Sequence, residues 1–72
     1  MMSNLERLVY MANQIAANFA ILGEAEAITA TAHHIADFWD PRMKANIRAV
    51  LEQNSASLTP MARAAVGQLP GA

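Results

Sequence analysis

Alanine supplies 16 of the 39 hydrophobic residues in this 72-residue chain, and cysteine is absent. Alanine favours the α-helix more than any other residue, but each alanine buries little apolar area. A chain of this length buries only about 60% of the surface that it exposes when unfolded. Without cysteine it has neither a disulfide nor a thiolate metal site to add stability. The composition therefore predicts an all-α domain with a marginal core of its own, stabilised by self-association or by a larger partner.

Capping signals and apolar spacing divide the chain into helices. Ser3 and Glu6 have the spacing of a capping box, and Gly23 suits the end of the first helix. Two pairs of a capping residue and a proline, Asp40-Pro41 and Thr59-Pro60, open further helices. We predict one domain over residues 1–72, a small bundle of three helices plus a short C-terminal fourth. The predicted helices span about 4–22, 24–39, 41–53 and 60–69, and residues 70–72 are expected to fray.

The charge balance excludes several classes of function. Five basic and six acidic residues give a net charge of −1, whereas a nucleic-acid-binding domain normally carries a basic face. The first residues lack the basic start and long apolar core of a signal peptide. No stretch reaches the roughly 18 apolar residues expected of a membrane span. We therefore expect a cytoplasmic protein that binds neither nucleic acid nor membrane.

The first predicted helix has no charged residue between Leu8 and Gly23. Its apolar stripe occupies one face, yet the opposite face also lacks the charges of an ordinary solvated helix. One interpretation is that alanine and amide side chains are polar enough for solvent. We favour the other, in which this helix contacts its own domain on one side and a partner on the other. That opposite face carries Tyr10, Gln14 and Ile21, with Met11, Ala17 and Asn18 beside them.

A corner between the second and third helices has the sequence FWDPRM, residues 38–43. We predict that Phe38 and Trp39 fill the core, because small cores depend on their aromatic residues. Arg42 is a cation in the first turn of a helix, where it opposes the helix dipole and would gain from an anion. Arginine, methionine and tryptophan are also enriched at protein interfaces, which makes this corner a candidate contact surface.

Catalytic and metal-binding patterns are weak in this sequence. His33 and Asp37 share a helix face, but two ligands do not make a metal site, so we predict a surface hydrogen bond or ion pair between them. There is no glycine-rich phosphate loop, and the serines show no triad-like pattern. We therefore predict a non-enzymatic chain that binds no metal and no cofactor.

Three segments resemble motifs of the delta subunits of NAD-dependent, molybdenum-containing formate dehydrogenases. Residues 8–16 resemble that family's MANQIA opening, and residues 34–43 resemble its HIxxFWDPRM motif. The tail from Leu58 resembles its LxPLVxxAL ending, with Thr59 where aspartate is frequent and Met61 where leucine is frequent. These matches cover nearly the whole chain, in order and at the family's usual length.

The resemblance implies a non-catalytic accessory subunit that binds the alpha subunit and aids its assembly or stability. It further implies that the alpha subunit holds bis-molybdopterin guanine dinucleotide and iron–sulfur clusters, while beta and gamma subunits pass electrons to FMN and NAD. Combining the motif positions with the uncharged face of the first helix gives a candidate partner interface. Its residues are Tyr10, Asn13, Gln14, His34, Trp39, Arg42 and Met43.

A second hypothesis uses the same uncharged helix face without a larger partner. In it the chain is a self-associating helical module, a homodimer with a regulatory or chaperone role. The two hypotheses differ in stoichiometry. A chain that is monomeric alone and co-purifies with a molybdoenzyme subunit supports the first, and a tight symmetric dimer without a larger partner supports the second.

Overall fold

The first helix begins where the capping box predicts. The computed structural model describes residues 1–70, and its α1 spans Asn4–Phe19. The Glu6 amide donates to Ser3 Oγ at 3.1 Å, and the Ser3 amide donates to Glu6 Oε1 at 2.9 Å. The α-helix is shorter than predicted, because Ala20–Leu22 forms a 3₁₀ turn, a common way for a helix to tighten at its end. Gly23 then adopts a φ of 97°, which side-chain-bearing residues rarely adopt.

The next two helices meet at the FWDPRM corner. Helix α2 spans Glu24–Phe38 and α3 spans Pro41–Gln53. Trp39 has extended backbone, so α2 ends one residue earlier than predicted. Asp40 is the cap of α3 and accepts a hydrogen bond from the Met43 amide at 2.8 Å. The predicted cap-plus-proline start of α3 is therefore confirmed.

The C-terminal segment contains one 3₁₀ turn and one short helix. Residues Ser55–Ser57 form the 3₁₀ turn inside the predicted loop, and α4 spans Pro60–Gly67. The Ala62 amide donates to Thr59 Oγ1 at 3.4 Å, which confirms the second cap-plus-proline start. Helix α4 ends two residues before the predicted boundary. The sequence predicts that residues 70–72 fray. In the structure the Pro70 carbonyl accepts a hydrogen bond from the Arg48 guanidinium, and residues 71–72 lie outside the described residues.

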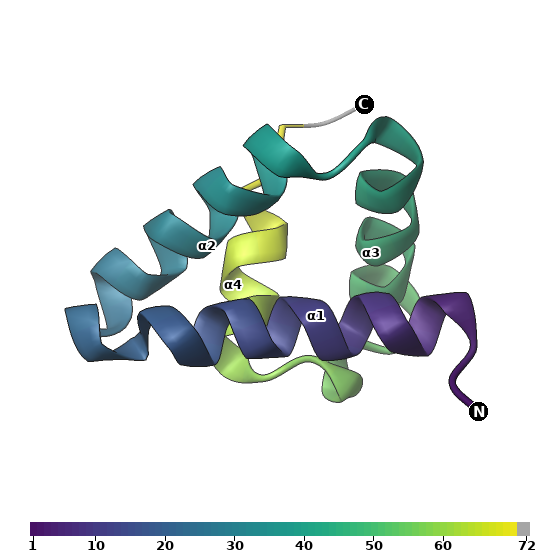
Figure 1. The fold of residues 1–72 in the computed structure, drawn as a ribbon, viewed down its shortest axis with the longest axis horizontal. Helices are drawn as coiled ribbons and strands as arrows, with labels where there is room; N and C mark the ends of the chain where they lie inside the picture. Colours follow the sequence, from purple (N-terminus) through teal and green to yellow (C-terminus); the bar gives the residue numbers. More distant parts are fainter. Residues whose placement is uncertain (71–72) are drawn as a thin grey trace.

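Helix α1 crosses the other three, and α4 lies between α2 and α3 (Figure 1). Helix α4 contacts α1, α2 and α3, so the shortest helix completes the core. Within residues 1–70 all regular structure is helical, which confirms the all-α prediction and the presence of four helices. The buried apolar cluster consists of Leu8, Ala12, Ala16, Ile35, Trp39, Ile47, Val50, Leu58, Ala62, Val66 and Leu69.

Alanine has a specific place in this core. Five alanines have no exposed surface at all, and they come from three different helices. A methyl side chain lets two helix backbones approach closely, which suits a short chain with few large apolar residues. The high alanine content therefore serves packing as well as helix propensity. These residues are Ala12, Ala16, Ala27, Ala62 and Ala65.

Candidate partner interface

The uncharged back of α1 faces solvent. Tyr10 is 58% exposed, and Gln14, Ala17 and Asn18 are also exposed. Met11 is half-buried and packs against the core, so it does not belong to this surface. Ile21, in the 3₁₀ turn that follows α1, is 92% exposed. Within residues 1–70, the structure thus leaves a long helix face without charge and without a covering element.

Asn13 is one of the candidate interface residues, but both polar atoms of its side chain form hydrogen bonds within the chain. Its Nδ2 donates to the Ser57 carbonyl at 3.1 Å, and its Oδ1 accepts from the Thr59 amide at 2.9 Å. These two bonds join the middle of α1 to the end of the 3₁₀ turn and to the cap of α4. Asn13 therefore holds a loop that is 44 to 46 residues away in the sequence.

Replacing Asn13 with alanine is expected to lower the free energy of unfolding by about 1–2 kcal/mol. Both loop groups lose their partner, and the half-buried Ser57 carbonyl loses more because water reaches it less easily. Urea unfolding followed by circular dichroism measures the difference. Asn18→Ala is the matched control, because Asn18 is exposed on the same helix and should change stability by less than about 0.5 kcal/mol. Equal effects of the two substitutions would contradict the structural role of Asn13.

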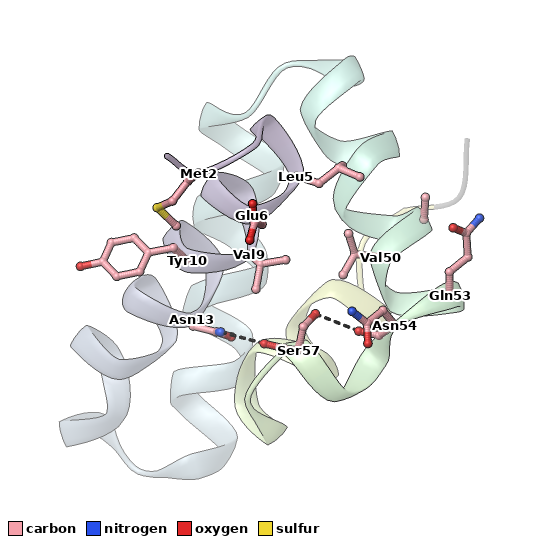
Figure 2. Close-up of a pocket in the computed structure, with 11 residues that line it drawn as sticks. Met2, Leu5, Glu6, Val9, Tyr10, Asn13, Val50, Gln53, Asn54 and Ser57 are labelled. Carbon is pink, nitrogen blue, oxygen red and sulfur yellow. Dashed lines mark hydrogen bonds between the residues drawn. The ribbon is translucent and has the colours of Figure 1, made fainter.

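A pocket of about 540 Å³ lies beside Asn13, between α1 and the C-terminal end of α3 (Figure 2). Val9 of α1 and Val50 of α3 face each other across it, and Leu5 extends toward α3. The polar end of the pocket is formed near Ser57, whose hydroxyl donates to the Asn54 carbonyl at 2.8 Å. The lining residues are Met2, Leu5, Glu6, Val9, Tyr10, Asn13, Ala49, Val50, Gln53, Asn54 and Ser57.

Glu6 carries the one formal charge among these lining residues. The pKa of its carboxyl is lowered, first by the hydrogen bond from the Ser3 amide and then by the Ser3 side chain. A lowered carboxyl pKa means that the charged form is favoured in the folded chain. The capping box therefore contributes stability above the ordinary glutamate pKa, and this contribution is lost as pH falls through the lower pKa of Glu6.

The two aromatic residues of the corner lie in different environments. Trp39 is 5% exposed and belongs to the core, as predicted. Phe38 is 75% exposed, so its predicted place in the core is wrong. Phe38 is the last residue of α2 and points outward, whereas the extended backbone of Trp39 turns the indole inward. A buried Trp39 ring is not part of the surface of the free chain.

His34 lies in a small aromatic group on α2. Its ring is 4.9 Å from the Phe38 ring and 6.4 Å from the Phe19 ring, measured between centroids. These separations fall within the range of favourable ring contacts. His34 is half-buried, so it joins α1 to the exposed Phe38 and presents only part of its ring to solvent.

The remaining candidates of the corner differ in exposure. Arg42 is exposed at the start of α3 and makes no hydrogen bond or ion pair within residues 1–70. Met43 is half-buried and packs against the core. His33 and Asp37 are both exposed, and no bond joins them in the described part of the chain, so the predicted surface pair does not form. Among the seven candidates, Tyr10, Gln14 and Arg42 are exposed and can therefore be reached by a partner.

Residues 7–66 match the family model of the NADH-dependent formate dehydrogenase delta subunit, FdsD. The chain belongs to the FdsD family. No curated protein and no solved structure matches it in the corresponding comparisons. Family membership makes the chain an accessory subunit of a formate dehydrogenase and confirms the resemblance carried by the MANQIA and FWDPRM segments.

The FdsD match spans residues with clearly different structural roles. It includes the loop-holding Asn13, the buried Trp39 and the exposed Arg42, and it excludes the capping box at Ser3. Within residues 1–70 no group of three or more His, Cys, Asp or Glu side chains is placed to hold a metal ion. None of the helices described there is both long enough and apolar enough to traverse a bilayer.

The sequence alone did not reveal the pocket between α1 and α3. The apolar spacing puts Leu5 and Val9 on one face of the first helix and Val50 on one face of the third, but it does not show that these faces border a common pocket. Nothing in the local pattern pairs one end of α1 with the far end of α3. The sequence feature closest to an indication of the pocket is Leu5, which lies at the edge of the apolar face of the first helix. In the structure Leu5 is 46% exposed.

Proposed function

We propose that this chain is a non-catalytic accessory subunit that binds the molybdenum-carrying alpha subunit of a formate dehydrogenase and aids its assembly or stability. The observation that carries the proposal is the FdsD match over residues 7–66. Bis-molybdopterin guanine dinucleotide, iron–sulfur clusters, FMN and NAD would then be held by the alpha, beta and gamma subunits. The chain itself would work in the cytoplasm, alongside those subunits.

Surface chemistry supports a docking role. The exposed face of α1 carries no charge between Leu8 and Gly23, and a helix contacted only by water normally carries several. The fully buried alanines give the core little apolar area, so a larger partner would add the stability that a chain of this size lacks. We propose Tyr10, Gln14 and Arg42 as direct partner contacts, and the exposed Phe38 with part of the His34 ring as a further contact.

An affinity experiment on the intact chain tests the proposed function. The tagged chain is co-expressed with the formate dehydrogenase subunits of its own source, purified at moderate salt, and the bound proteins are identified by mass spectrometry. Recovery of the alpha subunit at a fixed ratio is the expected result. Recovery of the chain alone, as a symmetric dimer, would overturn the proposal in favour of a self-associating module.

Replacing Arg42 with alanine is expected to weaken binding to the alpha subunit about tenfold and to leave helical content unchanged. The guanidinium is exposed and makes no bond within residues 1–70, so the fold does not depend on it. Arginine is among the residues that most often dominate interface energy. Circular dichroism and a binding titration give the two measurements. Lys44→Ala removes a neighbouring cation of α3 and serves as the control, and an equal loss for both variants would indicate only a general charge effect.

A further inference from the structure

The pocket between α1 and α3 gathers exposed apolar side chains. Seven large hydrophobic residues are exposed within residues 1–70, and three of them line this pocket. Met2 and Leu5 are each 46% exposed and Tyr10 is 58% exposed. Isolated exposed apolar residues are ordinary, but a contiguous group around a hollow typically marks a binding surface.

The form of the pocket suits a protein segment better than a small molecule. A small ligand is usually enclosed over most of its surface, whereas the walls of this pocket include three half-exposed side chains. Two helices, α1 and α3, form the sides, and Val9 and Val50 face each other between them (Figure 2). A groove between two helices with apolar walls is the geometry that accepts an amphipathic helix through its apolar face.

The charge of the groove specifies its occupant further. Among the described residues that line the groove, Glu6 is the one with a charge, and none is a lysine or arginine. Its Oε1 is occupied by the Ser3 amide, while Oε2 has no hydrogen-bond partner within residues 1–70. The capping box thus holds a carboxylate in place with one oxygen available for a cation. The opposite rim, at Gln53 and Asn54, is neutral and polar.

We infer that the groove between α1 and α3 binds an amphipathic helical segment of the alpha subunit that carries apolar side chains and one lysine or arginine. The apolar side chains cover Leu5, Val9 and Val50, and the cation pairs with Glu6. This inference rests on the proposed function, because it assigns the docking site of the same partner. The groove lies at the C-terminal end of α3, whereas Arg42 lies at the N-terminal end of the same helix.

Binding of the purified alpha subunit to two groove variants tests the inference. Ala49→Leu fills the groove from α3 and is expected to weaken binding at least about tenfold. Its control is Ala45→Leu, which adds the same side chain at an exposed position of α3 outside the groove. Glu6→Gln removes the charge but keeps the capping box, since glutamine also serves there. We expect it to weaken binding about five- to tenfold and to reduce the salt dependence, whereas Glu24→Gln, in the first turn of α2, changes neither.

The outcomes separate the two proposals. If the unmodified chain does not bind the alpha subunit, the proposed function fails. If the unmodified chain binds and both groove variants bind equally well, the groove assignment alone is overturned. Should Ala49→Leu lower the melting temperature, Glu6→Gln decides, because it leaves the core untouched. A photo-crosslinker in place of Leu5 should attach to an alpha-subunit segment bearing apolar residues and a lysine or arginine, and attachment to a second copy of the chain would overturn the inference.

Discussion

Replacing Trp39 with alanine is expected to lower the free energy of unfolding by about 3–5 kcal/mol. Trp39 is 5% exposed and belongs to the buried cluster that joins all four helices. A domain of this size has a total stability of roughly 4–11 kcal/mol, so the loss is a large fraction of the whole. Each kcal/mol shifts the melting temperature of such a domain by about 4–8 °C. Thermal and urea unfolding, both followed by far-ultraviolet circular dichroism, measure the effect.

The neighbouring residue supplies a matched control. Phe38→Ala removes an aromatic ring of similar type one position earlier, but from a side chain that is 75% exposed. We expect it to change stability by less than about 1 kcal/mol, the remaining effect coming from the ring contact with His34. A melting curve that does not move in Trp39→Ala would contradict the core placement and would indicate that the indole faces the partner.

This pair of aromatics shows where sequence patterns succeed and where they stop. The caps at Ser3, Asp40 and Thr59 were predictable because each depends on side chains within three residues. The inward and outward directions of Trp39 and Phe38 depend instead on where α2 ends. A shift of one residue at a helix end changes the direction of a side chain by about 100°, and helix ends are the least predictable part of a helix.

The candidate interface was predictable only in part, for a related reason. A family motif marks positions, but it does not distinguish a residue that binds a partner from one that holds the fold. Asn13 and Trp39 stand in such motifs, and the structure gives both of them internal partners. The bonds of Asn13 connect residues more than 40 positions apart, so no periodicity along the chain could indicate them. The lack of charged residues between Leu8 and Gly23 was a more direct indication of the candidate interface, because many of these residues are exposed on the surface.

The alanine content makes a second strong prediction, about overpacking. Ala12→Leu is expected to lower the free energy of unfolding by about 1–3 kcal/mol, because a well-packed core has no room for a larger side chain. Ala12 has no exposed surface, and its helix α1 contacts α2, α3 and α4. The added atoms must therefore displace one of these helices or adopt a strained rotamer. Urea unfolding gives the stability, and the slope with denaturant reports any loss of compactness.

Ala17→Leu is the control for this prediction, because Ala17 lies on the same helix but is exposed. Leucine and alanine are both good helix formers, so the control should change stability by less than about 0.5 kcal/mol. If Ala12→Leu were instead neutral or stabilising, the core would contain unfilled space, and the fully buried alanines would not be needed for close helix contact. A large loss at position 12 alone would show that alanine sets the spacing of the helices. It would also explain how so short a chain encloses a core with few large apolar residues.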